Sequence, residues 1–212
     1  MLFKNRFDAA EKLAKKLIHY KNNKDAVILA IPRGALEIGN VLAKRLNLQL
    51  DIILTKKIPH PYSEEYAIGA VSLKNYVVDE TAVNTENVSE DYIKKQVKEI
   101  RKNLKEKYKK YIGEEPINLK GKIVIIIDDG IATGNTIKLA IDMARKEKAK
   151  KVVVAIPVAP SENIIQLKEL ADEVVCLETP FPFFAIGQFY ETFTQVDDDE
   201  AIRLLKEVRV KR

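Results

Sequence analysis

The stretch "VIIIDDGIATGNT", Val124 to Thr136, decides the fold of this 212-residue chain. Its apolar, β-branched start indicates a buried strand, and its polar end indicates a turn that leads into a helix. Asp128 and Asp129 stand side by side where the strand ends. Adjacent carboxylates repel each other and resist burial, so they need a cation or hydroxyl donors beside them. The stretch therefore predicts a ligand site between a strand and a helix.

Similar apolar runs alternate with helical patterns along most of the chain. The expected strands are residues 26–32, 50–57, 122–128, 151–157 and 173–178. Helices are expected from Asp8 with Glu11 in a capping-box-like start, over about 36–46, after the two strands that end at 128 and 157, and from Asp197 with Glu200. This alternation predicts an α/β fold with a doubly wound, mainly parallel central sheet covered by helices on both faces.

The middle and the end of the chain depart from this alternation. Residues 58–66 contain two prolines and predict a loop, 67–79 predict a hairpin around Lys74 and Asn75, and 91–111 predict one long amphipathic helix. We expect a single domain, with an insertion at about 56–118 and a C-terminal hood and helix at about 178–212.

Composition limits the classes of function. The 36 Lys and Arg exceed the 31 Asp and Glu, and one cysteine with two histidines cannot form a disulfide framework or a Cys/His zinc site within one chain. No apolar stretch approaches the ~20 residues that a membrane helix needs, and the first residues show no signal-peptide pattern. We expect a cytoplasmic protein without a membrane partner.

Polar loops follow three of the expected strands: "PRG" after Ile31, "TKK" after Leu54 and "DDGIATGNT" after Ile127. The carboxyl ends of parallel strands share one edge of a sheet, so these loops are expected to meet in one crevice. The residues 133–136 begin a helix, whose unpaired amides and positive dipole end suit a phosphate. Asp128 and Asp129 would accept hydrogen bonds from the vicinal hydroxyls of a ribose.

The stretch 124–136 resembles the phosphoribosyl-pyrophosphate signature of type I phosphoribosyltransferases, which is an apolar strand, two acids, three variable residues and T-G-x-T. The segment "IPRG" (31–34) stands where that family has its pyrophosphate loop, and "TKKIPHPYSEEY" (55–66) where it has a flexible loop. The resemblance covers most of 26–177. The flanks resemble, less specifically, uncharacterised members with an "AIGA" hairpin and a "GQFY" tail.

The resemblance implies a role for each matching residue. Asp128 and Asp129 would hold the ribose 2′- and 3′-hydroxyls, and Arg33 with Gly34 would meet the pyrophosphate. Lys56 or Lys57 would neutralise charge on the leaving group. The 5′-phosphate would lie in the loop formed by Ala132, Thr133, Gly134, Asn135 and Thr136.

The implied reaction displaces pyrophosphate from C1 of the sugar by a nitrogen of a purine or pyrimidine base, through an oxocarbenium-like transition state. The implied cofactor is Mg²⁺, held mainly by the substrate, with Asp128 and Asp129 as further possible ligands. A homodimer is also implied. The 6-oxopurine members carry an Asp where this chain has Ala132, which disfavours hypoxanthine and guanine and leaves the other bases open.

Each assignment has a plainer alternative. Arg33 could cap a surface turn, Lys56 and Lys57 could be solvated, His60 is expected on a loop surface, and Glu64 and Glu65 could lie on that surface or reach the site. The aromatic run (Phe181, Phe183, Phe184, Phe189 and Tyr190) could cover a base or form a small satellite core.

The segment 91–111 carries nine Lys or Arg against three acids. A solvated face with the apolar stripe packed on a sheet is favoured over contact with nucleic acid or a subunit interface. The rival function is a regulator that senses phosphoribosyl pyrophosphate and binds nucleic acid through this helix. It ranks second because the sequence has no helix-turn-helix extension and shows no stacking platform with interleaved basic residues. We also expect that replacing both Asp128 and Asp129 by Asn abolishes turnover with little loss of stability.

Overall fold

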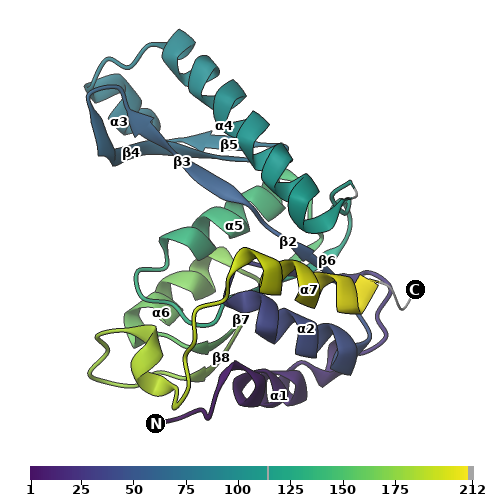
Figure 1. Ribbon diagram of the computed structural model, residues 1–212. Coiled ribbons are helices and arrows are strands. Elements are labelled where there is room, and N and C mark those ends of the chain that lie inside the picture. Colours follow the sequence, from purple (N-terminus) through teal and green to yellow (C-terminus); the bar gives the residue numbers. More distant parts are fainter. Residues whose placement is uncertain (114, 210–212) are drawn as a thin grey trace. The chain divides into compact units, whose positions relative to one another are not determined.

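The computed structural model describes residues 1–113 and 115–209, and it is drawn in Figure 1. The chain divides into two compact units: Met1–Ile53 with Glu115–Arg212, and Leu54–Glu114. Each unit is described by itself.

The first unit is built on a five-stranded parallel sheet in the order β2-β1-β6-β7-β8. Its strands are β1 (Ala26–Ala30), β2 (Gln49–Ile52), β6 (Ile123–Ile127), β7 (Lys151–Val158) and β8 (Glu173–Glu178). Ala30 pairs with Ile127 on one side and with Ile52 on the other, so these three strands end at the same edge. The parallel sheet confirms the predicted fold class.

Helices cover both faces of this sheet (Figure 1). They are α1 (Arg6–Lys16), α2 (Ala35–Leu46), α5 (Asn135–Lys146), α6 (Ser161–Leu170) and α7 (Asp198–Arg209), with the short 3₁₀ turns η1 (Ile18–Tyr20) and η2 (Ile186–Phe189). Alternate residues of β1 and β6, such as Val27 and Val124, pack with Ile137 and Ile141 of α5. Helices α1, α2 and α7 pack together on the opposite face. A strand buried on both faces must be apolar throughout, which explains the unbroken apolar runs.

The start of α1 differs from the prediction. Asn5, not Asp8, is the N-cap, because its side chain accepts a hydrogen bond from the Asp8 amide. The sequence also predicts that Leu13, Leu17 and Ile18 share one helical face, but the helix ends at Lys16, so Ile18 lies in η1 and is exposed. The start of α7 agrees with the prediction, since the Asp197 carboxylate accepts from the Glu200 amide.

The second unit contains a three-stranded antiparallel sheet in the order β3-β4-β5. Its elements are β3 (Thr55–His60), β4 (Ser63–Ser72), β5 (Tyr76–Val78), α3 (Glu80–Thr85) and α4 (Glu90–Ile112). The predicted hairpin is confirmed, with the Ser72 amide donating to the Asn75 carbonyl at 2.8 Å.

The predicted long helix is confirmed as α4, which Ser89 caps. Its apolar stripe is buried and packs on β3 and β4. The stripe consists of Ile93, Val97, Ile100, Leu104, Tyr108 and Tyr111. Because this unit's own sheet covers the stripe, the interpretation of the stripe as a subunit interface is wrong.

Two predictions between residues 50 and 66 are also wrong. The expected strand 50–57 is two strands, β2 and β3, which belong to different sheets. The expected loop 58–66 is mostly strand. Pro59 is accommodated because it lies on the edge strand β3, at a shift in the register with β4. His60 therefore points into the unit and is buried, and the side chains of Glu64 and Glu65 lie outside the described residues.

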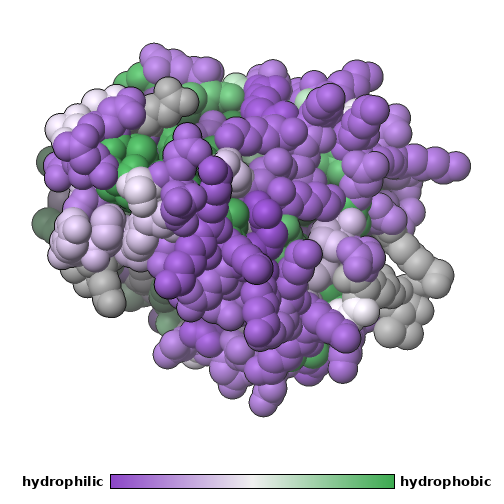
Figure 2. Space-filling view, turned by 90° about the horizontal axis from the view of Figure 1, so that it is seen from above, coloured by the Kyte–Doolittle hydropathy of each residue, from purple (hydrophilic) through white to green (hydrophobic). Residues whose placement is uncertain are grey.

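Within the described part of the chain, none of the helices combines the length and the apolar character that crossing a membrane requires. The face drawn in Figure 2 is mostly hydrophilic, with hydrophobic residues in small separate areas.

Candidate functional site

The loops after β1 and β6 meet at Gly34 and Asp129. A Cβ atom added to Gly34 would lie 2.1 Å from Oδ2 of Asp129, a distance that no side chain can occupy. Only glycine therefore fits at position 34 while the Asp129 carboxylate keeps its place. The structure thus brings together two of the three loops that were expected to meet.

Arg6 holds the Asp129 carboxylate in place. Its Nε donates to Asp129 Oδ2 at 2.8 Å, and its Nη1 donates to Glu37 Oε2 at 2.9 Å and to the Thr194 carbonyl at 2.8 Å. The guanidinium carbon lies 3.9 Å from the centroid of the Phe193 ring, and the residue is only 5% exposed. Arg6 therefore ties the first helix, the acid pair and the C-terminal segment together.

Sequence reasoning missed Arg6, which is 123 residues away from its partner. One signal could have found it. Arg6 shares a helical face with Ala9, Ala10 and Leu13, which are all buried. A charged residue on the buried face of a helix must find a partner, because an unpaired buried charge is strongly unfavourable.

The two carboxylates of the pair differ in their surroundings. Asp129 is 9% exposed and pairs with Arg6, and its carbonyl accepts a hydrogen bond from the Tyr190 hydroxyl at 2.7 Å. Asp128 is half-buried, and its Oδ1 accepts from the Asp129 amide at 2.9 Å. Loss of water, and then the charge of Asp129, raise the pKa of Asp128 well above its usual range. Among the described residues, Asp129 therefore has a cationic partner and Asp128 has none.

This asymmetry changes the expectation that both acids can be removed at little cost in stability. For Asp128 we still expect little cost in stability, because it forms no ion pair with any described residue. For Asp129 we expect a larger cost, because Asn at this position would leave the buried Arg6 without its carboxylate.

The loop 132–136 leads into α5 through Gly134, which has φ of +78° and provides no side-chain cap. The first amides of a helix have no partner within it, so those of α5 are open to an external acceptor. Asn163 of α6 holds the loop in place by donating from Nδ2 to the Ala132 carbonyl at 3.0 Å. Ala132, Thr133, Asn135 and Thr136 are exposed. Asn163 was not identified from the sequence.

Arg33 follows β1, and the peptide bond between Pro32 and Arg33 is cis. Its Nη1 lies 3.3 Å from Oδ1 of Asp198, at the start of α7. The two side chains are 37% and 35% exposed, so solvent screens the pair, and an anionic ligand can compete for the guanidinium. Lys56 and Lys57 lie on β3 of the second unit, where both are exposed, and their role stays a prediction.

The aromatic run divides between core and surface. Phe189 and Tyr190 are buried with Phe3 in a small cluster, as the satellite-core interpretation predicts. Phe181 and Phe184 are exposed. The segment also contacts the site loop, since a Cβ on Gly130 would lie 2.6 Å from Ile186.

The protein offers few ligands for a metal ion. No group of three or more His, Cys, Asp or Glu side chains within the described residues is arranged to hold one. Carboxylate oxygens suit Mg²⁺, which commonly binds through one or two carboxylates plus substrate phosphates. Because Arg6 engages Asp129, Asp128 is the carboxylate that fits a magnesium ion carried by a substrate.

Comparison with known proteins shows the family of the chain. Residues 2–190 match the family described as "Phosphoribosyl transferase domain", and the chain belongs to this family. Proteins from two strains of Mycobacterium tuberculosis, named provisionally as phosphoribosyl transferases, are 38% identical to it over 211 residues, which is 96% of this chain and 46% of each relative. The chain thus spans about half the length of these curated relatives. The crystal structure of a Thermus thermophilus protein covers 98% of this chain and 99% of its own, with 32% identity and a TM-score of 0.82.

Proposed function

We propose that this protein transfers the 5-phosphoribosyl group from phosphoribosyl pyrophosphate to a nitrogenous base and releases pyrophosphate. The observation that carries the proposal is the close approach of Gly34 to Asp129. It brings the acid pair, which follows β6, next to the "PRG" loop, which follows β1. The two strands are neighbours, and both loops lie at the carboxyl edge of the sheet. Ligands bind at this edge in parallel α/β sheets.

The residues suit the two ends of an activated sugar phosphate. The open amides at the start of α5, with Thr133 and Thr136, would bind the 5′-phosphate. Asp128 would accept hydrogen bonds from the ribose hydroxyls, and these would satisfy its half-buried carboxylate. Arg33 would leave Asp198 to contact the pyrophosphate, while Gly34 leaves room for the pyrophosphate beside the backbone.

Bound Mg²⁺ would neutralise charge on the pyrophosphate oxygens. The remaining tasks fall to the chain itself. It must hold the sugar in one orientation and stabilise the charge that develops on the leaving group. Asp128 orients the ribose ring, and Lys56 or Lys57 is predicted to contribute positive charge at the leaving group. Ala132, a small residue, favours an acceptor other than a 6-oxopurine.

The test is a screen of adenine, hypoxanthine, guanine, uracil and orotate for release of pyrophosphate from phosphoribosyl pyrophosphate with Mg²⁺. Asp128→Asn should abolish the release that the wild-type protein gives with its base. Asp142→Asn, a matched change at an exposed position on α5, should leave it unchanged.

Calorimetry with phosphoribosyl pyrophosphate separates the two candidate functions. Binding without pyrophosphate release from any base would favour the regulatory alternative. No binding at all, or full activity of the Asp128→Asn variant, would contradict the proposed site.

A further inference from the structure

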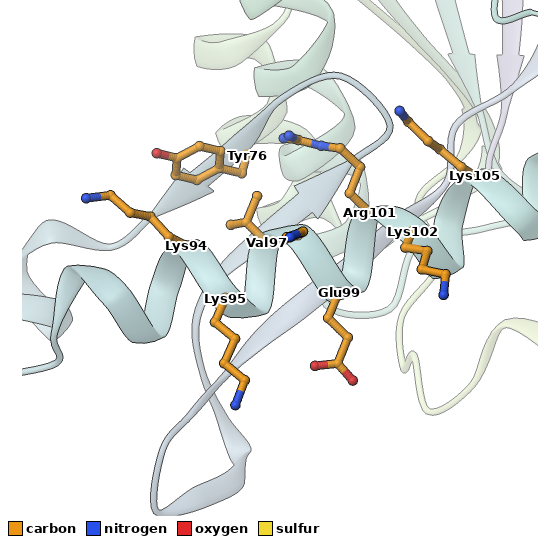
Figure 3. Close-up of a pocket in the computed structure, with 9 residues that line it drawn as sticks. Tyr76, Lys94, Lys95, Val97, Glu99, Arg101, Lys102 and Lys105 are labelled. Carbon is orange, nitrogen blue, oxygen red and sulfur yellow. The ribbon is translucent and has the colours of Figure 1, made fainter.

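A groove of about 680 Å³ lies along α4 in the second unit and shares no residue with the candidate site (Figure 3). Its wall is formed by one helix and one residue of the edge strand β5. The lining residues are Tyr76, Lys94, Lys95, Val97, Lys98, Glu99, Arg101, Lys102 and Lys105. Six of these nine residues are cations and one is an acid, so the groove is strongly positive.

The cations form a row along the helix. Lys94, Lys98, Arg101 and Lys105 recur every three or four residues, which places them on one face over about 16 Å. In Figure 3, Glu99 points to the side opposite Tyr76. The row therefore presents positive charge without an acid among it.

Most of this charge is not neutralised by the residues that the structure describes. Lys94 pairs with Glu90 at 2.8 Å. Among the residues that the structure describes, none forms an ion pair with Lys95, Lys98, Lys102 or Lys105. Like charges at this spacing on a helix repel each other, so an external polyanion would relieve the repulsion.

Arg101 adds a second observation that points to a ligand. Its Nε is buried and has no hydrogen-bond partner among the described residues. Buried donors almost always find an acceptor, which can be an ordered water or a ligand. Figure 3 shows the Arg101 side chain on the same side of α4 as Tyr76, where an anion in the groove could accept from the guanidinium.

Tyr76 supplies an aromatic surface beside the row. Tyr76 is 42% exposed, and in Figure 3 its ring lies over α4 between Lys94 and Arg101. The sequence could not show this arrangement, because the ring comes from β5 whereas the cations come from α4. The fold thus places an aromatic ring beside a row of cations that lies elsewhere in the sequence.

We propose that this groove binds single-stranded nucleic acid. A positive channel that follows a phosphate backbone, with an aromatic ring on which a base can stack, is the usual construction of such sites. A duplex hides the faces of its bases, so Tyr76 would have nothing to stack on. The proposal does not depend on the transferase activity.

The test is fluorescence anisotropy with a labelled single strand of ~12 nucleotides, as RNA and as DNA, and with the matching duplex. The single strand should bind more tightly than the duplex. Four phosphate contacts predict a slope of log affinity against log salt of about −3. Lys98→Glu with Lys105→Glu should weaken binding at least about tenfold and make the slope shallower by about 1 to 1.5.

Lys15→Glu with Lys16→Glu is the matched control, because it makes the same charge change at exposed positions on α1. It should have a much smaller effect. Equal loss of binding in the two double variants would overturn the proposal, since net charge alone would then explain the affinity. Binding too weak to measure at about 0.15 M salt would overturn it as well.

Tyr76 distinguishes nucleic acid from other polyanions. Tyr76→Ala should weaken binding of the single strand roughly five- to hundredfold, and Tyr76→Phe should not, because stacking needs only the ring. Tyr62→Ala, at a 92% exposed tyrosine of the same unit, is the control and should bind like the wild-type protein. If Tyr76→Ala binds like the wild type, or if an acidic peptide binds as tightly as the single strand, the groove is not a nucleic-acid site.

Discussion

The buried ion pair between Arg6 and Asp129 gives the sharpest test of the site. Arg6→Met keeps most of the side-chain length and removes the charge. Asp129, which is 9% exposed, would then keep its negative charge but lose the guanidinium nitrogen that lies 2.8 Å from its Oδ2. Removing one partner of a buried pair destabilises a protein by about 3–5 kcal/mol, because the other charge stays buried without compensation. The Thr194 carbonyl also loses its donor.

The expected loss can be measured by urea denaturation and by thermal unfolding. For a chain of this size, a loss of about 3–5 kcal/mol corresponds to a fall in Tm of roughly 6–20 °C. Arg203→Met is the matched control. Arg203 pairs with Glu200 and Glu207 on the surface of α7, so its removal should change the free energy of unfolding by less than about 1 kcal/mol.

A second substitution tests the cause. Asp129→Asn in the Arg6→Met background removes the stranded charge, so it should restore part of the lost stability. The reasoning is refuted if Arg6→Met unfolds within about 1 kcal/mol of the wild-type protein, the level expected of an exposed pair. It is also refuted if Asp129→Asn lowers the stability of Arg6→Met further.

Three more predictions concern the loops. Gly34→Ala should displace the Asp129 carboxylate, reduce pyrophosphate release at least about tenfold and destabilise the protein by about 1–3 kcal/mol, as urea denaturation would show. Asn163→Ala should weaken binding of phosphoribosyl pyrophosphate in calorimetry, because the Ala132 carbonyl loses its donor. Asp128→Asn should make the free energy of unfolding depend less on pH. The folded state raises the pKa of Asp128, so this residue stabilises the fold at low pH, and that stabilisation is lost as the pH rises through the raised pKa. If the stability of the Asp128→Asn variant depended on pH as strongly as that of the wild-type protein, this prediction would be contradicted.

The sequence could predict those parts of the fold that depend on local patterns. The strands β1 and β6, and β7 after Lys151, are apolar because both faces are buried, and α4 shows its stripe because one face packs on a sheet. The acid pair could be placed at a strand end because the turn and helix after it are local as well. These features need no knowledge of what lies across the molecule.

Apart from the N-cap of α1, which is a local matter, the errors occur where the decisive contact is distant in sequence. Nothing between Ile52 and Thr55 breaks the β-pattern, so the change from one sheet to another was not visible. Two prolines suggested a loop, although an edge strand with a register shift accommodates Pro59. Arg6 and Asn163 position the site from other helices, and their partners cannot be identified from spacing alone.

Arg6 also explains how two adjacent acids can lie in a site proposed for a polyanionic sugar. Two free carboxylates would repel the phosphates of the substrate as well as each other. Here the buried guanidinium of Arg6 neutralises the charge of Asp129. The raised pKa of Asp128 shows that the protein alone stabilises the charge of this second carboxylate only weakly. Ribose hydroxyls would stabilise that charge by donating to it. Asp129 would then serve to position Asp128 and the Gly34 loop, and Asp128 would make the contact with the sugar.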